Sequence, residues 1–236
     1  MSGQTLSTRR STFDGLLEGR ICAECNSGWM SRLETDAQGI VLDTADGRRR
    51  LSGLDNEERF CLARWATKTA YTLNSAANFP LKVPTEHLVH LASQGAPVDG
   101  VRVYGSQLEG HAKLTWVQGP IWRTESETLA QQRYDALAHE SYKVALQVGR
   151  LMMLVAYWPD PGWRHILATG LHEQIWPRGG ARLVYPSVLR PMDHPDGALF
   201  IFHCSLGVTA STAWDAPLQL RGAVGWPPAG LEEATP

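Results

Sequence analysis

The sequence predicts an α+β fold, in which a buried helix precedes a mainly antiparallel sheet. Apolar residues recur with helical period over residues 56–74, and more briefly over 85–93. From Val98 onward the pattern changes to the alternating or continuous apolar runs of strands. With 236 residues, 43% of them hydrophobic, the chain can bury a sizeable core in one domain, or in one domain with a small appendage.

Composition argues against several classes of protein. Charged residues make up 19% of the chain and the formal net charge is −2, so the chain lacks the basic excess typical of nucleic-acid-binding proteins. Phosphate-binding GxxxxGK[ST] and GxGxxG motifs are missing, as is GxSxG, which argues against nucleotide-dependent enzymes and α/β-hydrolases. We therefore expect no nucleotide cofactor, and any contact with DNA must come from a local patch.

Cysteine usage and hydropathy indicate the compartment. Four cysteines lie at positions 22, 25, 61 and 204. Only the first two are close in sequence, so the set does not indicate a disulfide framework and suits a reducing cytosol. No apolar run follows Arg9 and Arg10 as it would in a signal peptide, and no stretch approaches the roughly 18 apolar residues of a membrane span. We expect a soluble, cytoplasmic protein without a membrane partner.

The first fifty residues combine a polar lead-in with a short helix. The lead-in covers residues 1–20, and a short amphipathic helix is expected over about 27–38. An Asp-Gly turn then precedes Arg48, Arg49 and Arg50, the strongest local positive charge in the chain. Such a run usually flanks a solvated turn, and contact with a phosphate is the alternative.

The clearest regular element is the helix expected over residues 56–74. Asp55 and Glu58 form a start that resembles a capping box. Lys68 lies in a run that is otherwise apolar or small, and we expect its amine to extend to solvent rather than toward a phosphate or a metal site.

A second, shorter helix is expected over residues 85–93, with Thr85 as its N-cap. His87 and His90 lie three apart on it and could in principle reach one metal ion. No carboxylate or cysteine accompanies them at a matching spacing, so we expect surface histidines.

The second half of the chain is predicted to form the sheet. A hairpin is expected to join residues 101–104 to 113–117, and residues 124–138 to form a loop or a short helix. One long strand over 142–158, bent or bulged at Gly149, is expected at the centre of the sheet because its run is nearly continuously apolar.

The last predicted strand covers residues 198–202. If it continues, His203 and Cys204 face opposite sides and cannot easily share a metal ion. After Trp214 the chain is rich in Pro, Gly and Ala and is expected to end in a flexible tail. The nine tryptophans show no repeat, so we expect them to fill the core rather than to stack on bases.

The stretch CAECNSGWMSRLE, residues 22–34, is the one place where spacing and residue type together suggest chemistry. Two cysteines separated by two residues can put both sulfurs on one tetrahedral zinc ion. A closed structural site needs four ligands, so this pair is half a site. The alternative is a pair of thiols that bind nothing.

This stretch resembles the second zinc knuckle of the HNH endonucleases, whose treble-clef (ββα-metal) site often ends in CxxCN followed by a helix. More specifically, CN-x-GWM-x-x-LE is similar to a bacterial HNH-type family in which a long helical and β region follows the knuckle. A looser likeness, through the Trp-Ala-x-Lys-Thr-Ala run at 65–70 and the later strands, extends over most of the chain. The resemblance implies a fold that begins with the remnant of a treble-clef knuckle.

The resemblance also implies roles for three residues. Cys22 and Cys25 would be the last two ligands of a structural Zn²⁺ ion, and Asn26 would turn inward at the start of the helix to help hold a catalytic divalent ion, Mg²⁺ or another. The implied activity is metal-dependent hydrolysis of phosphodiester bonds in DNA, with a histidine as general base.

The first half of this constellation is absent from the sequence. In the resembled family the first CxxC and the catalytic histidine lie upstream of the second knuckle, whereas residues 1–21 contain neither Cys nor His. An HNH endonuclease-like chain of this kind would take its histidine from elsewhere, belong to a longer gene product, or be inactive. A second hypothesis is a non-catalytic zinc-knuckle module that binds a partner, and a third is that Cys22 and Cys25 are free thiols.

These observations divide the chain into three parts. Residues 1–40 hold the lead-in and the half knuckle with its helix, residues 41–213 form the α+β body, and residues 214–236 form the tail. The sequence leaves the oligomeric state open.

Overall fold

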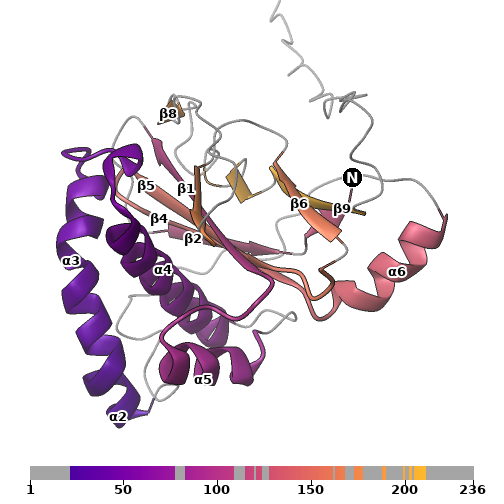
Figure 1. The fold of residues 1–236 in the computed structure, drawn as a ribbon, viewed down its shortest axis with the longest axis horizontal. Helices are drawn as coiled ribbons and strands as arrows, with labels where there is room; N and C mark the ends of the chain where they lie inside the picture. Colours follow the sequence, from indigo (N-terminus) through magenta and orange to yellow (C-terminus); the bar gives the residue numbers. More distant parts are fainter. Residues whose placement is uncertain are drawn as a thin grey trace, which may run out of the picture.

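The computed structural model describes most of the chain between Cys22 and Ala210 (Figure 1). The expected lead-in over 1–20 and tail over 214–236 lie outside the described residues. The residues described are 22–77, 83–108, 115–119, 121–123, 128–161, 163–167, 173–177, 188–189, 199, 202–203 and 205–210. They form helices and a mainly antiparallel sheet, which confirms the α+β class.

The main sheet is built from antiparallel neighbours. Its spatial order is β2 (Thr115–Gly119), β4 (Tyr142–Val148), β5 (Leu151–Tyr157), β1 (Val101–Leu108) and β7 (Glu173–Trp176). A short strand, β8 (Val188–Leu189), pairs with β1 in parallel.

A smaller sheet packs on one face of the main sheet. Its order is β3 (Trp122–Arg123), β9 (Leu206–Ala210) and β6 (Trp163–Leu167). Side chains of β9 share an apolar cluster with β4 and β5, which places the smaller sheet on that face. The helix α6 (Thr128–Ala138) lies at the same end of the molecule (Figure 1). It confirms the helical alternative for residues 124–138.

The hairpin expected between residues 101–104 and 113–117 is wrong. The strands form, but β4 and β5 lie between β1 and β2. β1 pairs with β5 over seven residues, from Val101 opposite Tyr157 to Gln107 opposite Leu151. An apolar pattern predicts that a segment is extended, but it does not choose the strand's partner.

The single strand expected over residues 142–158 is also wrong, because the run folds back on itself. Val148 pairs with Leu151 across a two-residue turn. Gly149 has φ +55°, a left-handed conformation that favours glycine and suits a tight hairpin. The expected central position is confirmed. The buried residues of β4 and β5 alternate between the two apolar clusters on either side of the sheet.

The strand expected over residues 198–202 is wrong where the structure describes it. Leu199, Phe202 and His203 have helical backbone and buried side chains, and the extended segment begins later, at Leu206. Short apolar runs fit a buried helix and a buried strand equally well. Cys204 lies outside the described residues.

The first helical segment is longer than predicted. It consists of α2 (Ala23–Cys25), a wider π-helical turn η1 (Asn26–Met30) and α3 (Ser31–Ala45), so the expected bounds of 27–38 are wrong at both ends. The backbone of Gly28 is non-helical (φ −90°, ψ −111°) and separates the cysteine-bearing turn from the regular helix.

One stripe of α3 packs into the core against α4 (Asn56–Ala76). Leu33, Ala37, Val41 and Ala45 recur every four residues and are at most 7% exposed, as expected for one face of a helix. The stripe belongs to the same apolar cluster as buried residues of α4 and of the main sheet.

α4 is the central helix of this layer, and its bounds confirm the prediction closely. It contacts α3, α5 (Thr85–Gln94) and four strands of the main sheet (Figure 1). Every residue from Trp65 to Asn74 is buried, because neighbours surround the helix.

Across the described residues, we find no helix with both the length and the apolar character needed to cross a membrane.

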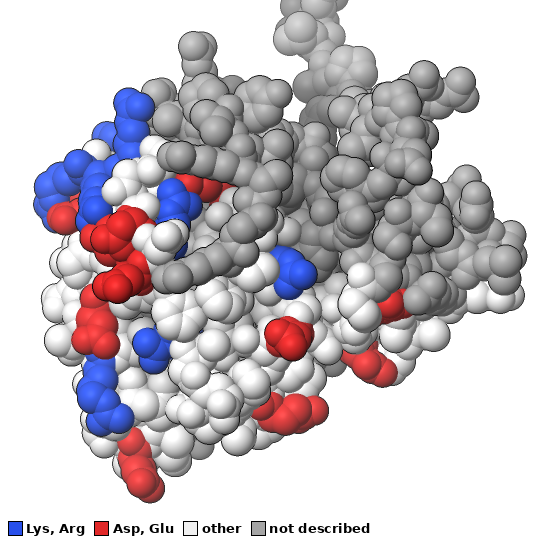
Figure 2. All heavy atoms as spheres, in the orientation of Figure 1, with Lys and Arg blue, Asp and Glu red and all other residues white. Residues whose placement is uncertain are grey.

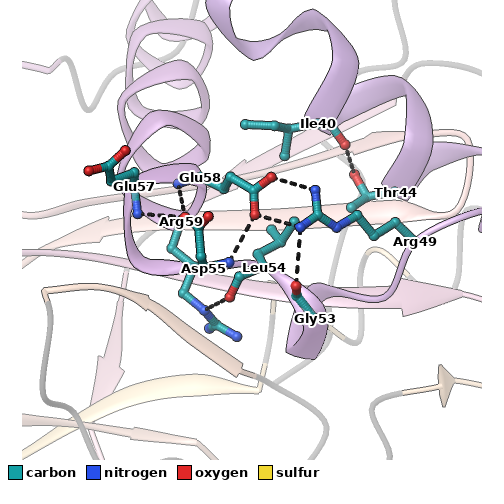
Figure 3. Close-up of polar contacts among 9 residues, drawn as sticks. All are labelled: Ile40, Thr44, Arg49, Gly53, Leu54, Asp55, Glu57, Glu58 and Arg59. Carbon is teal, nitrogen blue, oxygen red and sulfur yellow. Dashed lines mark hydrogen bonds and ion pairs between the residues drawn. The ribbon is translucent and has the colours of Figure 1, made fainter.

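The predicted capping box starts α4 (Figure 3). The Asp55 carboxylate accepts hydrogen bonds from the backbone N–H groups of Glu57 and Glu58, both at 2.9 Å, and the Asp55 N–H donates to Glu58 Oε2 at 2.9 Å. The Arg49 guanidinium donates to both Glu58 oxygens, at 2.5 and 2.6 Å. These hydrogen bonds from Arg49, followed by the one from the Asp55 backbone, lower the pKa of Glu58.

The tryptophans with described side chains occupy the core, as predicted. Trp65 and Trp158 are buried, and Trp29, Trp116 and Trp176 are half-buried against the helical side of the core.

The turn between β4 and β5 is packed against the end of α3. The Arg150 N–H donates to the Ala45 carbonyl oxygen at 2.7 Å, and a Cβ atom on Gly149 would lie 2.6 Å from that oxygen. Gln107 of β1 donates to the Thr44 carbonyl at 3.0 Å. The sheet therefore fixes the C-terminal end of the helix whose other end carries the cysteines.

We expect Gly149→Ala to lower the free energy of unfolding by about 2 kcal/mol or more, because it combines a left-handed φ with a collision against Ala45. Gly39→Ala is the matched control. Gly39 is exposed within α3 and has open space around it, so this change should raise stability by about 0.5–1 kcal/mol. Urea denaturation of both variants tests this, and a Gly149→Ala protein as stable as the parent would contradict the packing of the turn.

Candidate functional site

The two cysteines of the CxxC pair lie next to each other at the start of α2. Cys22 is the N-cap, and its Sγ accepts a hydrogen bond from the Cys25 backbone N–H at 3.1 Å. Cys22 is exposed, whereas Cys25 is half-buried. The hydrogen bond between the two thiols is the first cause that raises the pKa of Cys25, followed by burial and the charges of Cys22 and Glu24.

Trp29 brings an indole N–H to the same place. Its Nε1 is buried and has no hydrogen-bond partner among the described residues, and it lies close enough to Cys25 to oppose the rise in that thiol's pKa. A thiolate accepts such a hydrogen bond better than a thiol does. The Trp29 N–H therefore offsets part of the rise in the pKa of the Cys25 thiol.

The described residues fit half of a structural zinc site. Cys22 and Cys25 supply two of the four sulfur or nitrogen ligands that tetrahedral zinc takes. In the part of the chain that the structure describes, no cluster of three or more His, Cys, Asp or Glu side chains is arranged to hold a metal ion.

Asn26 follows the cysteines at the surface. It is exposed, and its backbone N–H donates to the Cys22 carbonyl at 3.0 Å. It opens the π-helical turn, so the side chain stands at the same end of the helix as the two sulfurs. An exposed amide there can offer its oxygen to a divalent ion.

Glu34 joins the two sequence runs on which the family resemblance rests. It belongs to the CxxCN-x-GWM-x-x-LE stretch, and its Oε2 accepts a hydrogen bond from Trp65 Nε1 at 2.9 Å. Its Oε1 accepts an ion-paired hydrogen bond from Lys68 Nζ. Trp65 and Lys68 belong to the Trp-Ala-x-Lys-Thr-Ala run on α4, so one carboxylate holds both runs together.

Lys68 differs from its prediction. Its side chain is buried, with a residue exposure of 7%, rather than extended to solvent. Burial lowers the pKa of Lys68 to about 8. Sequence reasoning missed this because a lysine stem on an apolar helix usually reaches water, and the partner lies 34 positions away in the chain.

The arginines at 48–50 are largely neutralised by neighbours. Arg48 pairs with Asp43 at 2.8 Å and with Asp46 at 2.7 Å. Arg49 pairs with Glu58, the glutamate of the α4 capping box. Figure 2 shows acidic and basic atoms side by side at this end of the visible face. Arg50 alone of the three has no ion pair among the described residues.

His87 is not the surface histidine that we expected. It is 8% exposed, and its Nδ1 lies 2.9 Å from the Tyr142 hydroxyl, which is itself 2.7 Å from the Tyr71 hydroxyl. Burial lowers the pKa of His87. The expectation for Thr85 is also wrong, since Pro84 is the N-cap of α5 and Thr85 is its first residue.

The other described histidines do not complete the candidate site either. His203 is 5% exposed and lies in the apolar cluster on the far face of the sheet, where burial and the Lys143 charge lower its pKa. His139 is exposed at the end of α6, 3.6 Å from Glu140. Among the described residues, no histidine belongs to a group of three or more His, Cys, Asp or Glu side chains that could hold a metal ion.

Comparison of the chain with protein-family models, with curated proteins and with solved structures gives no match.

The Glu34–Lys68 contact predicts an unequal pair of substitutions. Glu34→Gln keeps an acceptor for Trp65 but leaves the buried ammonium without a carboxylate. It should lower the free energy of unfolding by about 1–2 kcal/mol, a figure reduced for the partial exposure of Glu34. Adding Lys68→Met removes the unpaired charge, so the double variant should lose less than the sum of the single losses. Strictly additive losses in chemical denaturation would show that the two side chains do not interact.

Because His87 is buried, we expect the protein to lose stability as the pH falls below neutral. In the folded protein the pKa of His87 lies below its ordinary value of 6.5. As the pH falls through 6.5, the imidazole of the unfolded chain therefore takes up a proton before that of the folded protein does, and the folded protein loses stability. Between pH 7 and 5 the parent should therefore lose more stability than His87→Leu, which cannot titrate. Equal losses in parent and His87→Leu would contradict the buried, neutral imidazole.

Proposed function

We propose that this chain is an HNH endonuclease-like protein whose CxxCN helix start is the second half of a treble-clef zinc knuckle. The observation that carries the proposal is the contact of Glu34 with Trp65 and Lys68. The two runs that resemble the family lie on α3 and α4, two helices that pack together. This contact joins them through one carboxylate, and it supports the proposal in that respect.

In this proposal the chain's own residues have distinct tasks. Cys22 and Cys25 bind a structural zinc ion, with the Trp29 N–H near the Cys25 sulfur. The Asn26 amide oxygen helps to orient a second divalent ion. That ion, when bound, supplies electrophilic stabilisation of the charge that develops on a phosphodiester.

Arg50 is the arginine of its run that stays available to a phosphate oxygen of DNA, because Arg48 and Arg49 are paired with carboxylates.

A non-catalytic module is the second candidate, and one specific observation favours it. Hydrolysis needs a general base within hydrogen-bond reach of the attacking water, and His87 and His203 are buried elsewhere in the fold. Without a base, the same knuckle would stabilise a helix start that presents a surface to a partner. For either candidate we propose the cytoplasm as the compartment, where cysteines stay reduced.

Divalent-dependent cleavage of plasmid DNA by the purified full chain separates the two candidates. If the protein is a nuclease, Asn26→Ala should lower the rate at least about tenfold while the folded state persists. Cys25→Ser should lower it by loosening the knuckle, and so should also lower the melting temperature. Ser27→Ala, next to Asn26 and equally exposed, is the matched control and should keep the parental rate.

Two results would count against the nuclease proposal. Cleavage that Asn26→Ala leaves unchanged would place the activity elsewhere or in a contaminant. No cleavage with Mg²⁺ or Mn²⁺, by protein shown to contain zinc, would favour the non-catalytic module. A Cys25→Ser protein as stable as the parent would contradict the structural role of zinc.

A further inference from the structure

The CxxC pair also has the arrangement of a dithiol that can close on itself. Cys22 and Cys25 occupy the N-cap and third positions of a helix start, and the Cys22 sulfur already lies 3.1 Å from the Cys25 backbone nitrogen. Residues three apart on a helix lie on the same face, about 5–6 Å apart between their Cβ atoms. The Cys22 sulfur already points toward the Cys25 backbone, so the two side chains lie on the same side of the turn.

The two sulfurs differ in the way that a dithiol exchange needs. Cys22 is exposed and open to an oxidant, whereas Cys25 is half-buried behind it. The more accessible sulfur of Cys22 is therefore the better first nucleophile. The remaining described cysteine, Cys61, lies half-buried on α4, and burial raises its pKa.

We propose that Cys22 and Cys25 form a reversible redox couple that closes to an intrachain disulfide in exchange with a small-molecule disulfide such as oxidised glutathione. The Cys22 thiolate attacks one sulfur of the oxidant, which forms a mixed disulfide and releases one thiolate. The Cys25 thiolate then attacks the Cys22 sulfur and releases the second. The two cysteines lose two electrons and two protons, and the oxidant becomes two thiols.

This couple does not depend on the proposed nuclease function. Zinc binding requires that the two cysteines are reduced, because a sulfur in a disulfide is not a thiolate and cannot serve as a zinc ligand. Oxidation and zinc binding therefore exclude each other at the same two atoms.

The sequence provides a direct readout of closure. Arg20 and Arg32 bracket residues 21–32, so trypsin releases both cysteines in one peptide. The full chain, reduced and freed of metal with a chelator, is treated with oxidised glutathione, alkylated and digested. Closure gives this peptide without alkyl groups and two hydrogen masses lighter than the dithiol, while the peptide with Cys61 is alkylated.

Single-cysteine variants assign the order of attack. Cys25→Ser should stop at a glutathione adduct on Cys22. Cys22→Ser should form its adduct on the order of tenfold more slowly, because Cys25 is shielded. A parent peptide that keeps two alkyl groups, or that accumulates the adduct without closing, would overturn the proposal. Equal rates of adduct formation in the two variants would overturn the assigned order.

A zinc arm separates this proposal from the previous one. If zinc added before glutathione blocks closure, and closure occurs without it, both proposals are supported. Closure at the same rate with and without zinc supports the redox couple and counts against zinc at these cysteines. Failure to close in the metal-free chain counts against the redox couple alone.

Discussion

The carboxylate of Glu34 is the polar contact that attaches the cysteine-bearing helix to the body of the protein. Around it, the stripe of α3 packs on α4, and α4 in turn rests on four strands of the main sheet. Glu34 adds specific polar interactions to this apolar contact, because its carboxylate accepts hydrogen bonds from the Trp65 indole and the Lys68 amine. An apolar stripe alone allows a helix to slide or rotate, whereas a buried, paired ammonium fixes register. The position of Cys22 and Cys25 relative to the core depends on this contact.

The opposite end of α3 is held by a different set of bonds. Gln107 donates to the Thr44 carbonyl, and Arg150 in the β4–β5 turn donates to the Ala45 carbonyl. The bond from Arg150 satisfies the Ala45 carbonyl, one of the groups that a helix end leaves without an internal partner, and the Thr44 carbonyl also accepts from the Gly47 N–H at 3.2 Å. Both ends of α3 are thus held in place. The non-helical backbone of Gly28 lies between this helix and the CxxC turn. The cysteines therefore lie on a short turn that Gly28 separates from the regular helix.

The sequence allowed prediction of the elements whose signals are local. The capping box at Asp55 and the helical period that follows located α4 to within two residues at its end, and the CxxC spacing indicated neighbouring sulfurs. Features that depend on distant partners were not predictable. The apolar run over 142–158 is equally compatible with one strand or a hairpin, and only the positive φ of Gly149 and its fit against α3 decide between them. The burial of Lys68 and His87 likewise depends on Glu34 and Tyr142, which are distant in sequence.

We propose that the Cys22–Cys25 turn, which the contact between α3 and α4 attaches to the core, binds a metal ion through its two sulfurs. The most direct test is the zinc content of the full chain purified under reducing conditions without added metal, beside a Cys22→Ser/Cys25→Ser double variant. The account predicts about one equivalent of zinc in the parent and almost none in the double variant. Less than about half an equivalent in the parent, or the same amount in both proteins, would contradict it.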